Sequence, residues 1–132
     1  MSMNIRDFRE LRVYDAAMYA AMEIFRITSD FPKEEKYSLT DQVRRSSRSV
    51  CSNIAEAWRK RRYRAAFIAK LSDAESEAAE TQVWLEFADK CEYIKGEIRK
   101  DLGMSYDRIL TQLVHMIHNA DDWTIRDKAK LK

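Results

Sequence analysis

The fold is decided by residues 43–67, whose sequence is VRRSSRSVCSNIAEAWRKRRYRAAF. Apolar residues recur through its first part at helical spacing, and a run of four basic residues, 59–62, follows without a glycine or proline. The segment therefore predicts a helix, a corner near residues 61–63 and the start of another helix. A single helix from residue 40 to residue 92 would be about 80 Å long at 1.5 Å per residue, which is implausible for a domain of this size.

Helix-breaking residues are scarce along the rest of the chain as well. The protein has 132 residues, of which 45% are hydrophobic and 35% charged, with only 2 glycines and 1 proline. So few turn residues leave room for about three or four chain reversals, and a β-sandwich would need many more. We expect one all-α domain covering residues 1–132, folded as an antiparallel up-down-up-down four-helix bundle.

Apolar periodicity places the four helices at about 7–29, 40–61, 64–92 and 97–120. Pro32 closes the first helix, and Ser38 with Asp41 three residues later resembles the cap of the second. The fourth helix is expected to continue through Gly103. Beyond it, Trp123 and Ile125 are expected to fold back on the end of the bundle, and residues 127–132 to fray.

Buried faces are predicted from the same spacing. For the first helix the expected core positions are Leu11, Tyr14, Met18, Ala21, Phe25 and Thr28, with Ala17 and Ile24 beside them. For the second helix they are Leu39, Val43, Val50, Ile54 and Trp58, and for the third they are Phe67, Leu71, Ala74, Ala78, Leu85 and Ala88. The serines at positions 46, 47, 49 and 52 indicate close approach of another helix, or alternatively a solvated face.

Charge is spread unevenly although the formal net charge is only +2. Residues 44–70 hold nine basic side chains and one acid, whereas residues 71–97 hold eight acids and two lysines. Arginine donates bidentate hydrogen bonds to phosphate, and Tyr63 or Trp58 could supply a stacking face. The candidate residues for binding RNA or DNA are Arg44, Arg45, Arg48, Arg59, Lys60, Arg61, Arg62 and Arg64.

The alternative is a structural or adaptor protein. In that interpretation the same cations pair with the acids of the following helix, within one subunit or across an interface with another subunit or a protein partner. The pI of about 8.5 lies below the value of about 9 that is typical of dedicated nucleic-acid domains, so both interpretations stay open. Phe8, Tyr14 and Trp84 are the aromatic residues that we expect at an interface between subunits.

Catalytic and metal-binding patterns are absent from the sequence. His115 and His118 lack the Glu-x-x-His context of a bundle di-metal site, and Cys51 and Cys91 lie far apart in the chain. There is no nucleophile-elbow sequence and no glycine-rich phosphate loop. We therefore expect no enzyme activity, no catalytic residues, no metal ligands and no cofactor.

No membrane-spanning segment is predicted. The longest uncharged stretch of the first helix, residues 16–22, is far shorter than the roughly 20 apolar residues that a span needs. Without a signal-peptide pattern, and with only two cysteines, a cytoplasmic and reducing environment is the default expectation.

Several segments resemble a known family. They are RVY at 12–14, FPKEE at 31–35, YSLTDQVRRS at 37–46, SVCSNIAEA at 49–57 and NADDW at 119–123. Together they are similar to the four-helix-bundle proteins of the 23S rRNA intervening-sequence family, and the similarity covers nearly the whole chain. The family commonly has proline where Cys51 stands and glycine where Ala57 stands. These departures suggest a straighter second helix and a corner displaced toward Tyr63.

The resemblance implies a cytoplasmic bacterial protein that assembles as a homopentamer and has no catalytic residues. A related branch, the accessory proteins of diversity-generating retroelements, forms a basic pentameric barrel that binds nucleic acid and a reverse transcriptase. Two hypotheses follow for this chain: an oligomeric bundle that binds RNA or DNA through its basic corner, and an adaptor whose charged faces mediate protein contacts.

Overall fold

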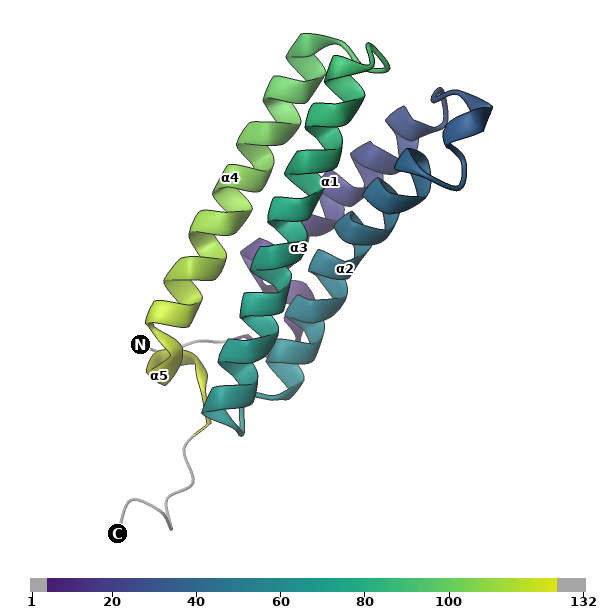
Figure 1. The fold of residues 1–132 in the computed structure, drawn as a ribbon. Helices are drawn as coiled ribbons and strands as arrows, with labels where there is room; N and C mark the ends of the chain where they lie inside the picture. Colours follow the sequence, from purple (N-terminus) through teal and green to yellow (C-terminus); the bar gives the residue numbers. More distant parts are fainter. Residues whose placement is uncertain (1–4, 126–132) are drawn as a thin grey trace, which may run out of the picture.

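Four long helices pack side by side in the computed structural model, which describes residues 5–125 (Figure 1). The elements are the short 3-10 helix η1 (Phe8–Glu10), α1 (Arg12–Thr28), the 3-10 helix η2 (Lys33–Glu35), α2 (Leu39–Arg59), α3 (Arg64–Lys90), α4 (Gly96–His118) and the single turn α5 (Ala120–Trp123). Helix α1 packs against α2, α2 against α3 and α3 against α4, and α4 also packs against α1. The prediction of an all-α four-helix bundle is confirmed.

Helix boundaries agree with the predicted ones at the corner and differ at the termini. The turn between α2 and α3 occupies residues 60–63, where a corner near 61–63 was predicted, and α4 runs through Gly103 without interruption. The first predicted helix is divided, because Leu11 is extended (φ −72°, ψ 130°) and separates η1 from α1. Helix α2 continues through Cys51 without interruption.

The predicted core of α2 and α3 is confirmed. All five predicted apolar positions of α2 are buried, and on α3 the buried positions are Phe67, Leu71, Ala74, Ala78, Thr81, Leu85 and Ala88. Of the four serines of α2, Ser46 and Ser47 are buried and Ser52 is exposed. The hydroxyls of Ser46 and Thr81 share a hydrogen bond of 2.8 Å, so α2 and α3 approach closely there.

The predicted buried face of α1 is partly wrong. Its core positions are Val13, Ala17, Ala20, Ala21, Ile24 and Thr28. Met18 is 39% exposed and Phe25 40% exposed, and Tyr14 is half-buried. Because α1 carries apolar side chains around most of its circumference, two neighbouring stripes fit a helical period, and the stripe of smaller residues takes the core. The larger side chains are left on the outer face.

The two connecting loops at one end of the bundle are joined by Glu35 (Figure 1). The Oε1 atom of Glu35 accepts hydrogen bonds from the Ser38 hydroxyl (2.5 Å) and the Leu39 amide (3.3 Å), while the Tyr93 hydroxyl donates to Oε2 (2.8 Å). Ser38 itself makes no capping bond, so the predicted cap of α2 is wrong. These hydrogen bonds, first the one from Ser38, lower the pKa of Glu35, and the bond to Glu35 raises the pKa of Tyr93 to about 12.

Helix α3 ends in a turn that positions Tyr93 for this contact. The amide of Tyr93 donates to the carbonyl of Ala88 (2.8 Å) and the amide of Glu92 to that of Asp89 (2.9 Å), which is the Schellman arrangement. Glu92 is left-handed, with φ 62°, at the position where glycine is most common. The chain therefore ends α3 without the glycine that would have marked the turn in the sequence.

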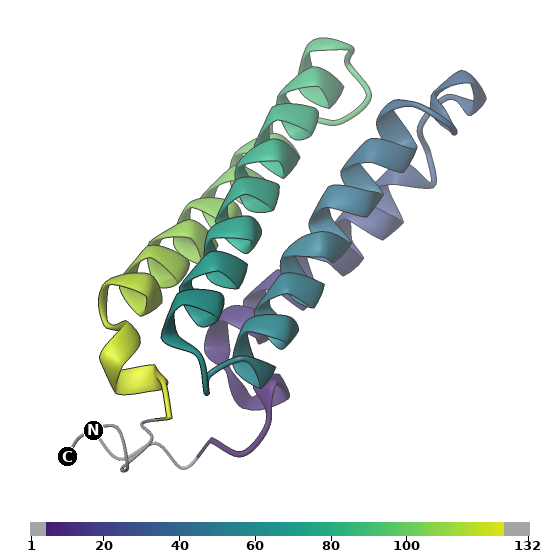
Figure 2. The same cartoon turned by 60° about the horizontal axis from the view of Figure 1, so that its bottom comes forward.

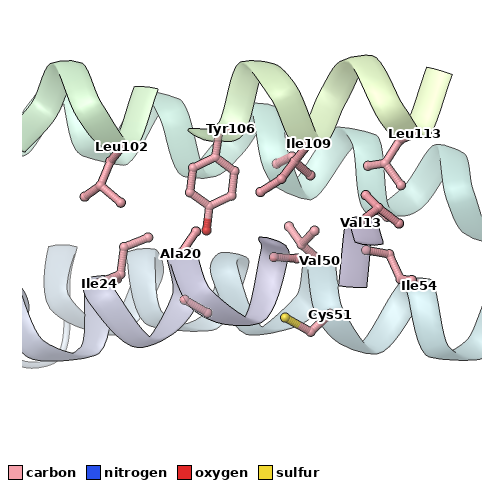
Figure 3. Close-up of a cluster of buried hydrophobic side chains, with 14 of the residues drawn as sticks. Val13, Ala20, Ile24, Val50, Cys51, Ile54, Leu102, Tyr106, Ile109 and Leu113 are labelled. Carbon is pink, nitrogen blue, oxygen red and sulfur yellow. The ribbon is translucent and has the colours of Figure 1, made fainter. Parts of the chain in front are cut away.

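Tyr106 crosses the centre of the core from α4 (Figure 3). Its side chain is fully buried, and its hydroxyl has no hydrogen-bond partner among the described residues. Figure 3 shows the hydroxyl pointing between the helices toward the side where Ala20 and Cys51 lie. Burial raises the pKa of the Tyr106 hydroxyl above its usual range, so the group stays protonated.

At the opposite end of the bundle the chain folds back beside the α2–α3 corner (Figure 2). Trp123 is half-buried and packs against the core, as predicted. Ile125 is 53% exposed and is attached through its backbone, whose amide donates to the Arg61 carbonyl (2.9 Å). The segment 127–132, which was expected to fray, lies outside the described residues.

Candidate nucleic-acid interface

The eight candidate cations fall into two groups at opposite ends of α2. Arg44, Arg45 and Arg48 lie on the first half of the helix, and the remaining five lie at residues 59–64, where α2 turns into α3. Arg48 and Arg59 are eleven residues apart on one helix, which is about 16 Å at 1.5 Å per residue. The sequence already placed the second group at the far end of the helix that carries the first, and in the structure the first group lines a hollow while the second forms a corner.

The first group lines a hollow of about 460 Å³ beside the start of α2. Its walls are Lys36, Tyr37, Thr40, Asp41, Arg44, Arg45 and Arg48. Four cations thus surround the space and one carboxylate opposes them. Sequence reasoning missed the contribution of Lys36 and Tyr37, because these residues precede α2 and only the folded loop brings them next to the arginines.

Arg44 is held in a fixed position in this hollow. Its Nε donates to the Thr28 hydroxyl (2.8 Å), one Nη donates to the Phe25 carbonyl (3.3 Å), and the guanidinium lies 4.8 Å from the Phe25 ring centre. These partners belong to the last turn of α1, whose free carbonyl groups and dipole favour a cation. Arg44 therefore has a structural role and presents part of its guanidinium to the hollow.

The other two arginines of the hollow are less constrained. Arg45 is exposed, and one of its Nη atoms donates to the Gln42 side chain at 3.3 Å. Arg48 is exposed and makes no hydrogen bond or ion pair within residues 5–125. Both can therefore rotate onto an incoming anion without losing an ion pair.

The second group forms the α2–α3 corner, which we define as residues 59–64. The Arg61 side chain is held in place by Trp58: its Nε donates to the Trp58 carbonyl (2.9 Å), and its guanidinium stacks 3.4 Å from the centre of a Trp58 ring. Partial burial and the charge of Arg59 lower its pKa. Tyr63, between Arg62 and Arg64, is 61% exposed and offers a ring face to solvent.

Ion pairing within the described part of the chain leaves most of these cations unneutralised. Among the eight, Arg64 alone forms an ion pair there, with Asp121 at 2.7 Å between two exposed side chains. The side chains of Arg59, Lys60 and Arg62 make no hydrogen bond or ion pair within that part. Lys70 lies 3.8 Å from Glu56, and this is the pair that joins α2 to α3. Within the described residues no ion pair joins the eight cations to an acid of α3. Burial raises the pKa of Glu77 on α3, and the charge of Arg45 opposes that rise.

An apolar groove of about 380 Å³ lies next to the hollow, between α1 and α2. Phe8, Tyr14, Met18, Met22 and Phe25 line one side of it, while Arg48, Cys51, Ser52 and Ala55 line the other. The rings of Phe8 and Tyr14 meet edge to face, with centroids 5.0 Å apart. The sequence signal for this groove is the apolar stripe of α1 that includes Tyr14, Met18 and Phe25, which was predicted to face the core.

Residues that suggested other chemistry are placed apart from one another. His115 is exposed in the last turn of α4 and contacts Asn119, Cys51 is buried, and Cys91 is exposed at the end of α3. Burial raises the pKa of the Cys51 thiol to about 11. Within residues 5–125 no three His, Cys, Asp or Glu side chains come together as a metal site would require. None of the helices in that range has the length and apolar character needed to cross a bilayer.

Comparison with known proteins decides the family. The family model described as 23S rRNA-intervening sequence protein matches residues 9–115. The chain belongs to this family. A crystal structure from Bacteroides thetaiotaomicron, described as a protein with unknown function from the S23 ribosomal protein family, is similar with a TM-score of 0.73 and 33% identity. The similarity covers 80% of this chain and 95% of that one. No curated protein matches the sequence.

The family assignment confirms the resemblance and covers α1, α2, α3 and most of α4, so it includes both cation groups. Neither the family description nor the structural relative indicates an enzyme activity. The function must therefore be argued from the surface itself.

Proposed function

We propose that this member of the 23S rRNA-intervening sequence protein family is a non-enzymatic bundle that binds RNA or DNA through the cations of α2 and the α2–α3 corner. The observation that carries the proposal is the lack of acid partners for Arg48, Arg59, Lys60 and Arg62 within the described residues. Like charges gathered without counter-charges repel one another, and a polyanion relieves that repulsion by displacing bound counterions.

The chemistry of the corner suits a nucleic-acid backbone. Arginine offers planar, paired donors that match phosphate, and Arg62 and Arg64 flank the exposed ring of Tyr63. Bases stack on such rings without regard to sequence. Contacts to phosphates and to ring faces position a nucleic-acid strand but do not recognise its base sequence.

The test is the salt dependence of binding to a structured RNA hairpin and a DNA hairpin of equal length, measured by filter retention from 50 to 200 mM salt. The triple variant Arg59→Gln/Lys60→Gln/Arg62→Gln should lower the slope of log K against log salt by about 2, given roughly 0.7 to 0.9 per phosphate contact. The control, Lys90→Gln/Lys95→Gln/Lys100→Gln, removes equal charge from the α3–α4 end and should leave the slope unchanged. Absence of retention at the lowest salt would refute the proposal.

We also propose that the protein self-associates, because it exposes apolar side chains on two different faces. Met18, Met22 and Phe25 on the outer side of α1 are about 40% exposed, while Val83 and Phe87 on α3 and Met104 on α4 are about half exposed. Contact between two unlike faces is heterologous and closes into a ring when the rotation between neighbouring subunits divides a full turn evenly. Five subunits is the number that the family resemblance suggests. The free thiols suit the reducing cytoplasm expected for it.

Light scattering tests this association against the 15.6 kDa mass of one chain. Met22→Glu and Phe87→Glu should each reduce the solution mass to that of a monomer. Val114→Glu, which places the same charge on a 49% exposed position of α4 outside both faces, should not. A wild-type protein that is monomeric at high concentration would contradict the proposal.

The adaptor function remains the second candidate, because residues 71–97 carry eight acids against two lysines. In a ring, α3 of one subunit could present these acids to the arginines of its neighbour. That arrangement would cover the cations in the free assembly, so accessibility of the arginines separates the two functions.

A further inference from the structure

The exposed edge of α2 links the two cation groups in a single line. Its members recur at spacings of 4, 3, 4, 3 and 4, which keeps them on one side of a helix, and they are Asp41, Arg45, Arg48, Ser52, Ala55 and Arg59. All are exposed except Ala55, which is half-buried. We call this line the α2 ridge. Because one uninterrupted helix carries it, the distance between its basic ends is fixed.

The hollow at the start of the ridge has the dimensions of a small-ligand site. Its volume of about 460 Å³ falls within the range of about 300 to 1,000 Å³ that is usual for such sites. The buried Thr40 contributes a hydroxyl to its wall, and Tyr37 is 84% exposed beside it. Arg44 is held by Thr28 and Phe25, so Arg45 and Arg48 are the arginines of the hollow that can turn toward an entering anion.

The length of the ridge sets the length of its ligand. From Arg45 at the hollow to Arg59 at the corner the helix extends about 21 Å at 1.5 Å per residue. A stacked strand advances about 3.4 Å per nucleotide, so about six nucleotides reach from the hollow to the corner. The side chains of Ser52 and Ala55 in the middle of the ridge are small, which leaves room for a strand to pass over them. The nearby carboxylate of Glu56 lies 3.8 Å from the ammonium group of Lys70.

We propose that the α2 ridge is a track for one single-stranded nucleic acid. One nucleotide is seated in the hollow with its base on Tyr37 and its phosphate on Arg45 and Arg48, and the strand continues to Arg59 and the corner. A single strand is favoured over a duplex because only an unpaired base can enter the hollow or stack on the exposed rings of Tyr37 and Tyr63. This inference rests on the proposed nucleic-acid binding and adds the class and minimum length of the ligand.

The experiment is fluorescence anisotropy with labelled oligouridylates of 4 and 12 nucleotides and with a 12-base-pair RNA duplex. Wild-type protein should bind the 12-mer at least tenfold more tightly than either the 4-mer or the duplex. Arg45→Gln/Arg48→Gln should lower the salt slope for the 12-mer by about 1.4, at roughly 0.7 per lost contact with a single strand. Lys95→Gln/Lys100→Gln, away from α2, is the matched charge control and should keep the wild-type slope.

A second pair of variants isolates stacking from charge. Tyr37→Ala should weaken 12-mer binding about tenfold, whereas Tyr37→Phe, which keeps the ring, should not. Tyr19→Ala removes a 68% exposed ring on α1 and serves as the control for loss of an exposed tyrosine.

Equal affinity for the 4-mer and the 12-mer, or a wild-type slope in the Arg45/Arg48 variant, would overturn the track and leave the corner as the whole site. Preference for the duplex would overturn the ligand class. If wild-type protein bound none of the oligonucleotides and neither hairpin, the proposed function itself would fail, and that result is distinguishable from failure of the track alone.

Discussion

Replacing Tyr106 with phenylalanine should stabilise the protein. The hydroxyl is buried in the centre of the bundle and has no partner among the described residues. Leaving such a group unsatisfied costs about 1–3 kcal/mol, while the ring of phenylalanine fills the same space. Allowing for relaxation around the site, we expect the free energy of unfolding to rise by about 1 kcal/mol.

The corresponding shift in melting temperature follows from the size of the chain. At about 2.1 cal/mol/K of unfolding entropy per residue, the 132 residues give roughly 0.28 kcal/mol/K. A gain of about 1 kcal/mol therefore raises Tm by about 4 °C. Calorimetry and urea unfolding monitored by circular dichroism measure both quantities.

The control is Tyr19→Phe, which removes a hydroxyl from a side chain that is 68% exposed and should change stability by less than about 0.5 kcal/mol. Destabilisation of Tyr106→Phe by 1 kcal/mol or more would refute the reasoning. It would mean that the hydroxyl is hydrogen-bonded in solution and that α4 packs differently against α1 and α2.

Three further predictions concern other parts of the molecule. Gly103→Ala should stabilise α4 by about 1 kcal/mol in urea unfolding, because an added Cβ would meet no atom within 4 Å; a loss of stability would show that α3 packs closer. Glu35 has a pKa lowered by its hydrogen bonds, so its stabilising contribution is present above the unfolded pKa of about 4.5 and is lost as pH falls through the folded value. Glu35→Gln should therefore reduce the dependence of stability on pH in the acid range, and an unchanged dependence would contradict the role of these hydrogen bonds. A thiol reagent such as dithionitrobenzoate should modify Cys91 rapidly in the native protein and Cys51 only after denaturation, because burial raises the pKa of Cys51 to about 11; two fast thiols in the native state would contradict the packing of α2.

The sequence predicts those parts of the fold that depend on local pattern. Helix α2 has one clear apolar phase, so residues such as Val50 and Ile54 were assigned correctly to the core. On α3 the spacing also placed Leu71 correctly, although Val83 and Phe87 leave apolar side chains on its exposed side. The corner was placed correctly, because helix length alone forbids a continuous helix there. On α1 the phase was wrong for Met18 and Phe25, since large apolar residues lie on both of its faces and only packing decides between them.

The candidate site depends on contacts between distant residues, which periodicity does not contain. The cluster of cations could be read from the sequence, but the anchoring of Arg44 by Thr28 and of Arg61 by Trp58 could not. The same holds for the bond between Tyr93 and Glu35, which lie 58 residues apart. The fold thus decides which cations are held by other groups of the protein and which can contact a ligand. Of the eight candidates, Arg48, Arg59, Lys60 and Arg62 have side chains without an acid partner among the described residues.

Arginine-selective modification with phenylglyoxal, followed residue by residue by mass spectrometry with and without a 12-nucleotide single strand, tests the central claim most directly. The account predicts that Arg45, Arg48, Arg59 and Arg62 react in the free assembly and become protected by the strand. Arg44 and Arg61, held by α1 and by Trp58, should react slowly in both states. If the first four were already protected without nucleic acid, a neighbouring subunit would cover them and the adaptor function would be favoured. If the strand changed none of them, the claim that α2 binds nucleic acid would be wrong.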